Sequence, residues 1–456
     1  MLIELTVQNF RSISESQNLS MVAGRASAKR PWASLKTGNH MVPSALRSAC
    51  LFGANGSGKS NVVKALAFLT DFVEHSAKDR QVDSIIDTQP FAYDAEWRES
   101  PTEIEVVFVH NGTLYQYGFI ADQDRVYDEW LFENPPSKET RLRKIFSRSF
   151  DEGSDTYDWY LNKTHLRGER ESWKNNTRDN ALFLSTAVQL NSSDLRAPYE
   201  WLVDNLRVVE DASRLSQGFS VKQFLEDGCK EEIIALMNSA DVPLEDLKIE
   251  VGKFDIDELP KELPKEAVEE FRRRYKDAQV IKNMETVRSD SNGAKITLDF
   301  EYESAGTQML FKLAGPLLHT LRSGITLVID ELQNNLHPLA LKYVVDLFAS
   351  EKNNPNGAQL IFTSHEASIL DDSCIHRDQV WFVEKHKNLS SHLFPLSSFK
   401  EREIASLQKA YLDGRFGGIP LINEIELQAI QADGEKARHP EGAKHEGSEA
   451  KAQEQQ

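Results

Sequence analysis

The stretch LFGANGSGKSNV at residues 51–62 constrains the fold of this chain more than any other segment. Gly53 and Gly58 enclose four residues, and Lys59 and Ser60 follow directly, which is the spacing of a phosphate-binding loop. Glycines at these positions let the backbone come close to phosphate oxygens, so that several N–H groups point at one anion. The pattern predicts a strand, a loop and a helix in succession.

The residues on either side of the loop agree with this prediction. Residues 49–52 are apolar and read as a short buried strand, and apolar residues recur at helical spacing from Val62 to Val73, so we expect a helix to begin near Lys59. Lys59 is expected to reach the β- and γ-phosphates of ATP, and Ser60 to bind Mg²⁺. The residues predicted to hold the nucleotide are Gly53, Ala54, Asn55, Gly56, Ser57, Gly58, Lys59, Ser60 and Asn61.

Length, charge and cysteine content limit the classes of fold and function that remain open to this chain. A chain of 456 residues with 40% hydrophobic content is long enough for two or three structural units. Its net charge of −18 argues against a general nucleic-acid coat, because such coats neutralise phosphates. Three scattered cysteines indicate neither a disulfide framework nor a zinc site, and no apolar run approaches the ~20 residues that span a bilayer. We expect a cytoplasmic protein without membrane contact.

The chain divides by pattern into a nucleotide-binding part that is interrupted and then resumed. Residues 102–110 and 113–121 alternate like strands around an Asn111-Gly112 turn, with a third strand expected at 125–133 and a further strand at the N-terminus. The predicted units are an N-terminal part of the ATPase head at 1–134, a mainly helical insertion at 135–292, a C-terminal part of the head at 293–424, and a disordered tail at 425–456.

A second half of the site is expected beyond residue 300. The buried strand in TLVIDELQNNLHP delivers Asp330 and Glu331 at its carboxyl end, where ligands of parallel sheets bind. Asp330 is predicted to hold Mg²⁺, and Glu331 to accept a proton from the attacking water. The strand in AQLIFTSHE ends near His365, which is placed to contact the γ-phosphate or orient the water, although a lone histidine at a strand end is more often structural.

A second anion-binding turn lies just upstream of the acidic strand. In ESAGTQMLFKLAGPLLHTL, Ser304 can cap a helix that begins near Thr307, and Gly306 allows close approach of the backbone. Taken alone, the turn is better explained as an ordinary helix cap. One active site needs one phosphate cradle, however, so we expect this turn to close over a nucleotide held by another subunit.

The phosphate cradle, the capped turn, the acidic strand and the strand-end histidine follow one another in the order found in ATP-binding-cassette ATPases. The chain resembles the ATP-binding-cassette-like ATPases of the AbiLii/RloA type, relatives of the OLD and SMC families found in phage-defence operons of bacteria. The resemblance spans nearly all of residues 1–420. It is carried by NFRS at Asn9–Ser12, GANGSGKSN at Gly53–Asn61, PFAYD at Pro90–Asp94, SAGTQ at Ser304–Gln308, IDELQNNLHP at Ile329–Pro338, TSHE at Thr363–Glu366, RDQVWFVEK at Arg377–Lys385 and YLDGRFGGIP at Tyr411–Pro420.

The resemblance implies an α/β fold, namely an ATP-binding-cassette-type P-loop ATPase head with an antiparallel β part and a mainly helical inserted subdomain. It implies that Gln89 senses Mg²⁺, that Ser304 and Gly306 form the signature, and that His365 is the switch histidine. It further implies a homodimer or higher homo-oligomer through heads that sandwich ATP. An ordinary loop amide explains Gln89 about equally well. The signature lacks a double glycine, and Gln333 stands where many relatives have an acid.

By the same resemblance the function is that of an ATP-hydrolysing sensor or regulator that controls a separate effector, a nuclease or toxin, in abortive-infection defence against phage. The alternatives are a DNA-maintenance or repair ATPase that acts directly on DNA, and a scaffold that binds ATP without turnover. Intact Glu331 speaks against the scaffold. Related nucleases carry an appended nuclease domain, whereas the fold-bearing sequence here ends near Ile422, and a helix-ending turn accounts for Asp413 beside Gly414.

Two basic clusters leave contact with nucleic acid open. The first is RLRKIFSR at Arg141–Arg148, and the second is FRRRYK at Phe271–Lys276. In the second, acidic residues stand four positions before the arginines, which is the spacing of an ion-paired, solvated helix face. The first cluster is therefore the better candidate.

Overall fold

In the computed structural model, the phosphate-binding loop joins a buried parallel strand to a long helix, as the sequence predicts. The structure describes residues 1–79, 81–136, 140–226, 228–253, 264, 269, 279–371, 375–399, 404 and 406–420. The chain divides into two units, Met1–Ile419 and Pro420–Gln456, and all the described helices and strands belong to the first. The predicted tail at 425–456 and the basic cluster Phe271–Lys276 lie outside the described residues.

A six-stranded sheet carries the loop. Its strands in spatial order are β11 (Leu206–Val209), β15 (Thr326–Ile329), β16 (Gln359–Thr363), β5 (Ser48–Phe52), β17 (Val380–Lys385) and β18 (Ser391–Pro395). The first five run parallel, and β18 pairs antiparallel with β17. Every residue of β5, β15 and β16 is buried, as expected for parallel strands covered on both faces. The carboxyl ends of β5, β15 and β16 therefore meet at one edge of the sheet.

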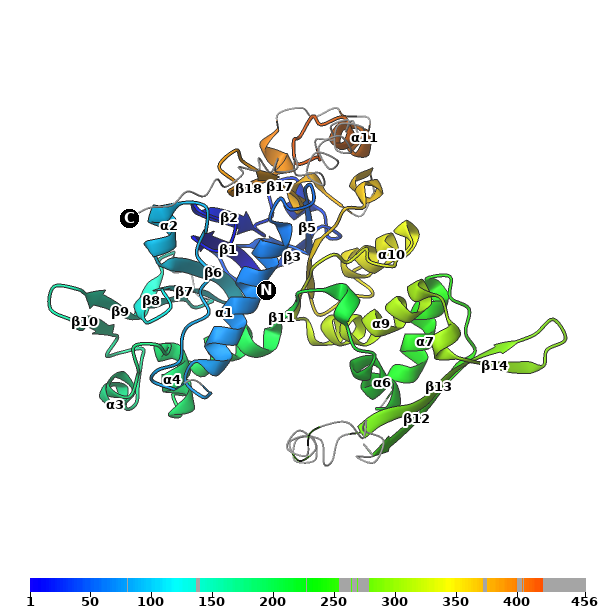
Figure 1. The fold of residues 1–456 in the computed structure, drawn as a ribbon, viewed down its shortest axis with the longest axis horizontal. Helices are drawn as coiled ribbons and strands as arrows, with labels where there is room; N and C mark the ends of the chain where they lie inside the picture. Colours follow the sequence, from blue (N-terminus) through cyan, green and yellow to red (C-terminus); the bar gives the residue numbers. More distant parts are fainter. Residues whose placement is uncertain are drawn as a thin grey trace, which may run out of the picture. The chain divides into compact units, whose positions relative to one another are not determined.

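A seven-stranded antiparallel sheet forms the second layer (Figure 1). Its strands in spatial order are β10 (Thr156–Leu161), β9 (Arg143–Asp151), β8 (Val126–Asn134), β7 (Thr113–Ala121), β6 (Thr102–His110), β1 (Leu2–Gln8) and β2 (Gln17–Ser20). The hairpin of β6 and β7 is the predicted one, with φ of 50° at Asn111 and 76° at Gly112, because a two-residue turn with two positive φ angles suits the strand twist. The pairing of β1 with β6 confirms that the N-terminal strand belongs to this sheet.

Helix α1 (Lys59–His75) lies between the two sheets and shares one hydrophobic core with both. Phe72 packs edge-on against Phe119 of β7 with ring centroids 5.3 Å apart, and Val63 and Leu66 belong to the same core as Leu51 of β5. The apolar stripe predicted from residue 62 onward is thus buried along its length. Because α1 contacts both layers, the loop at its start is fixed to the centre of the fold.

Other helices cover the opposite face of the six-stranded sheet and form a second core with it. They are α6 (Gly218–Leu225), α7 (Cys229–Ser239), α9 (Ala305–Ser323) and α10 (Pro338–Ala349). Helix α10 starts with proline at its first turn, where no backbone donor is lost. Helix α9 starts at the predicted Ser304 cap and ends at Gly324, whose φ is 66°. Both helices begin beside loops that belong to the predicted site.

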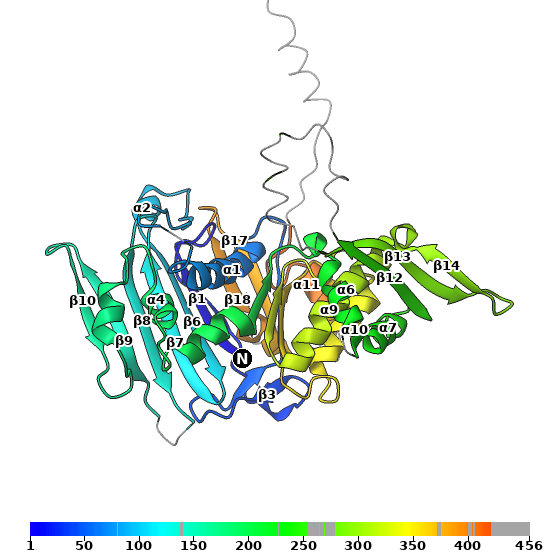
Figure 2. The same ribbon diagram turned by 90° about the horizontal axis from the view of Figure 1, so that it is seen from below.

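The segment at 135–292, expected to be mainly helical, contains strands as well as helices in its described part. In its described part, β9 and β10 extend the antiparallel sheet and β11 joins the parallel sheet, while β12 (Asp246–Lys253) and β13 (Gln279–Ser289) pair with β14 (Lys295–Asp299) in a third sheet beside α6 and α7 (Figure 2). Of the strands in this segment, β10 contains no fully buried residue, so its apolar pattern is weak in the sequence.

The remaining described elements are short. They are β3 (Ser34–Lys36), β4 (Ser44–Leu46), α2 (Ala95–Glu99), α3 (Arg170–Asn175), α4 (Phe183–Gln189), α5 (Arg196–Glu200), the π-helix η2 (Trp201–Asn205), α11 (Leu407–Leu412), and the 3₁₀ turns η1 (Ser27–Lys29), η3 (Ala212–Arg214), η5 (Phe300–Tyr302), η6 (Ala367–Asp371), η7 (Arg377–Gln379) and η8 (Leu396–Ser398). Asp413 directly follows α11, which confirms the helix-ending turn predicted there. Among the described helices, none is both long and apolar enough to cross a bilayer.

Candidate functional site

The phosphate-binding loop runs from Gly53 at the end of β5 to Ser60 in the first turn of α1. Gly56 and Gly58 have φ of 73° and 108°, which side-chain-bearing residues rarely adopt. A Cβ on Gly58 would lie 2.0 Å from the hydroxyl of Ser391, whereas one on Gly56 would face open space. The glycines thus hold the loop against the protein on one side and leave it open on the other, as a phosphate cradle requires.

Two residues outside the predicted loop, Ser12 and Ser391, brace it. The Ser391 hydroxyl donates to the carbonyl of Ser57 at 2.6 Å, and it lies 2.6 Å from the hydroxyl of Ser12. The Asn61 amide donates to the Ser12 hydroxyl at 2.6 Å, and the Ser391 N–H donates to the Ser12 carbonyl at 2.7 Å. The NFRS turn and the start of β18 therefore fix the loop from outside. No local pattern around Ser391 marks it in the sequence.

Lys59 is 5% exposed and folds back onto the loop, where its amine donates to the carbonyls of Gly53 and Ala54 at 2.9 and 3.1 Å. Burial lowers the pKa of this amine to about 8, although the carboxylates of Asp330 and Glu331 act in the opposite direction. Carbonyl oxygens are weaker partners for an ammonium than phosphate oxygens are. The Lys59 amine is thus a cation that a phosphate chain can draw away from its present partners.

The acidic residues follow β15, and β16 holds them in place. Asp330 is 6% exposed, and its Oδ1 accepts a hydrogen bond of 2.5 Å from the hydroxyl of Thr363 at the end of β16. The same hydroxyl accepts from the backbone N–H of Glu331 at 2.8 Å. Parallel pairing of Ile329 with Phe362 sets this register. Sequence reasoning missed Thr363, although it stands in the TSHE motif directly before Ser364 and His365.

Glu331 has a φ of 53°, an unusual value for a residue with a side chain that costs about 1–3 kcal/mol. Its Oε2 accepts a hydrogen bond of 2.9 Å from the Asn334 amide. Strain of this kind persists where the surroundings enforce it, here through Thr363 and Asn334. The carboxylate is therefore held in a defined position at the strand end.

His365 completes the group at the carboxyl edge of the sheet. Although its side chain is exposed, desolvation lowers its pKa below the ordinary value, and the charge of Lys59 lowers it further. The carboxylates of Glu331 and Asp330 act to raise it. The structure thus brings Lys59, Asp330, Glu331 and His365 close enough to influence one another's charge, and the lowered pKa favours a neutral imidazole near pH 7.

The signature turn lies apart from this group. Ser304 caps α9 as predicted, since its hydroxyl accepts from the N–H of Thr307 at 3.1 Å, and Ser304 itself is exposed. A Cβ on Gly306 would lie 3.0 Å from the carbonyl oxygen of Asn335, so this turn packs on the loop that follows the acidic strand. A cavity of about 380 Å³ adjoins both segments. Within the described residues, no hydrogen bond joins the Ser304 turn to the phosphate-binding loop of the same chain.

Gln89 is joined to the loop through its backbone and not through its side chain. Its carbonyl accepts from the N–H of Arg11 at 2.6 Å, and Arg11 precedes Ser12, the residue that contacts Asn61. The Gln89 amide donates instead to the carboxylate of Asp87 at 3.3 and 3.4 Å. Its role in binding Mg²⁺ stays a prediction.

The residues at the edge of the sheet fit Mg²⁺ and ATP by their chemistry. Hydroxyl, carboxylate and amide oxygens from Ser60, Asp330 and Gln89 are the hard ligands that Mg²⁺ takes. The Ser57 hydroxyl is 1% exposed and has no hydrogen-bond partner among the described residues, as suits a loop built for an anion. The structure thus places the phosphate-binding loop with Lys59 close to the carboxylates of Asp330 and Glu331.

The first basic cluster is not one positive face. Arg148 is 1% exposed and its Nε lies 3.1 Å from the buried carboxylate of Glu129, while Arg143 lies 3.3 Å from Glu133. Both cations are therefore already paired with carboxylates of the neighbouring strand β8.

Comparison with known proteins finds one matching family and several solved structures with low sequence identity to this chain. Residues 48–371 match the model of a family described as "AAA domain, putative AbiEii toxin, Type IV TA system". No curated protein matches this chain. Among solved structures, the SMC head domain from Thermotoga maritima has 12% identity and a TM-score of 0.38, over 86% of this chain and 98% of that chain. The recombination mediator protein RecF-ATP has 12% identity and a TM-score of 0.35, over 86% of this chain and 99% of that chain.

Proposed function

Because this chain belongs to the AAA-domain family whose description names the AbiEii toxin and a type IV TA system, and thus carries an ATPase domain of the AAA/ABC type, we propose that it binds and hydrolyses ATP to regulate an effector in defence against phage. The observation that carries the ATPase proposal is the convergence of Lys59, Asp330, Glu331 and His365 at the carboxyl edge of one parallel sheet.

ATP is held by the loop from Gly53 to Asn61. Its N–H groups and the start of α1 bind the phosphates, and Lys59 exchanges its carbonyl partners for the β- and γ-phosphates. Ser60 and Asp330, with Gln89 after a change of rotamer, hold Mg²⁺. When bound, the cation offsets the negative charge of the phosphates.

The proton acceptor is Glu331. Thr363 and Asn334 fix its backbone and side chain, so that its carboxylate is oriented before the substrate arrives. His365, neutral near pH 7 because its pKa is lowered, donates a hydrogen bond to the γ-phosphate or orients the attacking water. Thr363 acts through Asp330 and Glu331 and is a positioning residue.

The active assembly is a dimer in which each nucleotide lies between two heads. Ser304 is exposed at the start of the 19-residue helix α9, where N–H groups favour an anion, and it has no bond to the phosphate-binding loop of its own chain within the described residues. A second copy therefore supplies the phosphate that this turn binds. Larger homo-oligomers built from the same contact fit the proposal equally.

The nucleotide state of this cytoplasmic assembly controls a separate effector, a nuclease or toxin. One observation supports a separate chain: the described residues contain no cluster of three acidic, histidine or cysteine side chains able to hold a catalytic metal.

Phage plating on cells that carry the chain with its neighbouring genes tests the proposal. We expect protection with the wild-type protein and its loss with Lys59→Ala, while Lys36→Ala, at the exposed last residue of β3, serves as a control for surface change. Protection that persists in Lys59→Ala would contradict a role for ATP. Growth arrest by the chain alone would place the toxin in this chain, and dependence on recombination genes would favour DNA maintenance.

A further inference from the structure

Strand β14 forms one edge of the three-stranded sheet of β12, β13 and β14, and within the described part of the chain no strand pairs with its outer side. All five of its residues are exposed, among them the apolar Ile296 and Leu298, which are 54% and 42% exposed. Figure 2 shows the hairpin of β13 and β14 extending past helix α7. An exposed edge strand of this kind offers free backbone groups to another strand.

The turn of this hairpin determines which backbone groups of β14 face outward. The N–H of Asp290 donates to the carbonyl of Ala294 at 2.9 Å, so these two residues form a hydrogen-bonded pair across the hairpin. In an antiparallel ladder, hydrogen-bonded and non-hydrogen-bonded pairs alternate along the strands. The backbone groups of Thr297, three residues after Ala294, therefore point to the free edge, as do those of the residues two positions before and after it.

The apolar side chains of β14 have polar neighbours inside their own sheet. Ile296 stands opposite Arg288 of β13, and Leu298 stands opposite Thr286. Because residues two positions apart lie on one face of a strand, Ile296 and Leu298 form an exposed apolar pair. Contacts between apolar side chains on adjacent strands stabilise a sheet. A strand added at the free edge supplies such contacts if it places apolar residues opposite this pair.

The charges of β14 are placed symmetrically about its centre. Its sequence is KITLD, with Lys295 two residues before Thr297 and Asp299 two residues after it. When two β14 strands pair antiparallel about Thr297, each lysine lies opposite the aspartate of the other copy, and each isoleucine lies opposite a leucine. A parallel pair in register instead brings like charges together. The strand is thus complementary to itself in one orientation and one register.

Contacts within the chain leave both charged groups able to pair. Nζ of Lys295 lies 3.9 Å from Oε2 of Glu245, and because both side chains are exposed this ion pair contributes little. Oδ1 of Asp299 accepts a hydrogen bond of 2.9 Å from the N–H of Glu301, and a carboxylate has further acceptor sites. Neither contact prevents pairing with a second copy.

The hairpin is ordered before a second strand binds. Oδ1 of Asp290 accepts from the N–H groups of Asn292 and Ala294 at 2.8 Å each, which fixes the turn. At the base of the hairpin, Nη2 of Arg288 donates to Oε2 of Glu303 at 3.0 Å. Because the strand already has its extended conformation, pairing costs little conformational entropy.

We propose that β14 pairs antiparallel with β14 of a second copy of this chain, centred on Thr297, and joins the two three-stranded sheets into one continuous sheet. The backbone supplies the hydrogen bonds, and the apolar pairs of the two strands pack on one face. The charges fix orientation and register, because exposed ion pairs add selectivity more than affinity. The contact uses no nucleotide and is separate from the proposed closure of two heads on ATP, so the two contacts together link closed dimers into larger assemblies.

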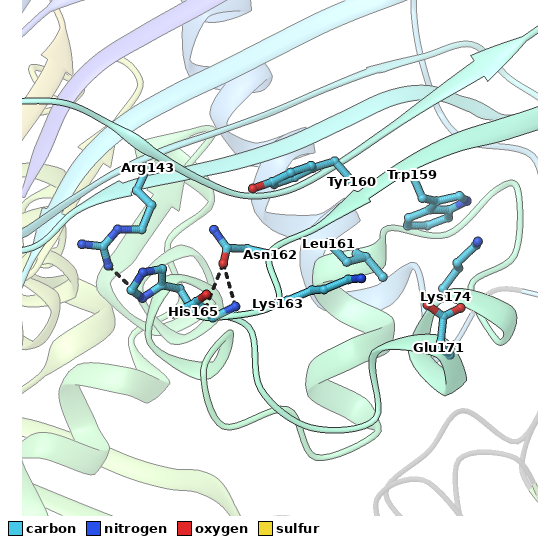
Figure 3. Close-up of a pocket in the computed structure, with 10 residues that line it drawn as sticks. Arg143, Trp159, Tyr160, Leu161, Asn162, Lys163, His165, Glu171 and Lys174 are labelled. Carbon is cyan, nitrogen blue, oxygen red and sulfur yellow. Dashed lines mark hydrogen bonds between the residues drawn. The ribbon is translucent and has the colours of Figure 1, made fainter.

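The edge strand of the seven-stranded sheet, β10, lacks this self-complementarity. Its one charged residue, Asp158, meets no cation in any pairing with a second copy, since β10 contains no lysine or arginine. The loop at 162–165 and helix α3 lie beside β10 and bound a cavity of about 700 Å³ with it (Figure 3). The amine of Lys144 also lies 5.5 Å from the ring centroid of Tyr160. The properties that favour self-pairing therefore belong to β14 and not to β10.

Sedimentation velocity of the full chain without nucleotide tests this proposal. A five-residue contact is small, and small contacts are weak, so we expect a monomer–dimer equilibrium with a Kd of about 10–100 µM. At about 1 µM this contact is open, so closure of the heads on ATP can be followed separately. A wild-type chain that stays monomeric well above this range would overturn the proposal and leave the edge to a strand of another protein.

Thr297→Pro tests the role of the backbone. It removes an N–H at the free edge, where the hairpin itself loses no hydrogen bond, and should weaken association at least tenfold. Circular dichroism checks that the variant is folded. Association of the folded variant as tight as that of the wild type would contradict pairing through β14.

Charge variants test the register at low salt. Lys295→Asp and Asp299→Lys each place like charges opposite one another, so each should associate about fivefold more weakly or less than wild type. An equimolar mixture of the two variants restores both opposite-charge pairs and should recover association. Lys248→Asp, the same charge change at an exposed position on β12, should change it less than twofold. Wild-type association of both single variants, or no recovery in the mixture, would overturn the proposal.

Discussion

The hydroxyl of Thr363 donates a hydrogen bond of 2.5 Å to Oδ1 of Asp330. It also accepts a bond of 2.8 Å from the N–H of Glu331, so one buried hydroxyl orients both acidic residues of the site. The parallel pairing of β15 and β16 alone creates this contact. The geometry of the proposed catalytic pair therefore depends on a residue of the neighbouring strand.

Thr363→Val removes this hydroxyl with little change in shape. We expect the free energy of unfolding to fall by about 1–3 kcal/mol, because the buried Asp330 carboxylate loses a partner. We expect ATP turnover to fall by about tenfold or more, because Asp330 and Glu331 lose their common support. Thr363→Ser keeps the hydroxyl and should retain most of the activity. Urea unfolding and phosphate release measure the two effects, and a Val variant with wild-type turnover would contradict the positioning role.

ATP affinity should depend on pH through Lys59. Burial lowers the pKa of its amine to about 8 in the nucleotide-free protein, and bound phosphates should raise it again. A group whose pKa rises on binding gives its full contribution below its free-state value, so affinity should be constant below about pH 8. Above that pH it should fall by up to about tenfold per unit as the free protein loses the proton.

Calorimetry in buffers of different ionisation enthalpy checks this prediction, with proton uptake expected on ATP binding at pH 8.5. Lys59→Arg keeps its charge throughout this range and should show no uptake. Lys59→Ala should abolish binding, because the loop loses its mobile cation. Equal wild-type affinity at pH 7 and pH 9 would contradict the assigned role of the amine.

Ser304→Arg tests the proposed sandwich of two heads. Ser304 is exposed and has no bond to the phosphate-binding loop of its own chain within the described residues, so a bulky cation there should leave ATP binding intact. It should block the facing head and lower turnover by about tenfold or more. Ser304→Thr keeps the helix cap and serves as the control. Wild-type turnover in the Arg variant would show that hydrolysis takes place within one chain.

The elements that the sequence predicts well are those with strong local patterns. The hairpin of β6 and β7 follows from alternating residues around an Asn111-Gly112 turn, and α1 follows from an apolar stripe after the glycine loop. The order of motifs along the chain also predicts that the loop, Asp330, Glu331 and His365 lie at one edge, because parallel strands end on the same side of a sheet.

Contacts between distant segments are not contained in such patterns. β11 pairs with β15 although their first residues, Leu206 and Thr326, are far apart in the chain, and only the assembled sheet brings them together. Ser391 reaches Ser57 in the same way, through a hairpin that follows β17. The residues proposed to carry the chemistry can therefore be predicted from the sequence, whereas the residues that hold them in position are found only in the folded structure.

Glu331 is the proposed base of an ATPase whose heads close on ATP. Glu331→Gln keeps the size of the side chain and the contact with Asn334 but cannot accept the proton. The most direct measurement is phosphate release by this variant, with light scattering of the same samples with and without Mg²⁺-ATP. We expect ATP to bind, turnover to fall by about 10²-fold or more, and the dimer to accumulate only when Mg²⁺-ATP is present. Wild-type turnover in the Gln variant, or slow turnover with no change in assembly on adding ATP, would contradict the account.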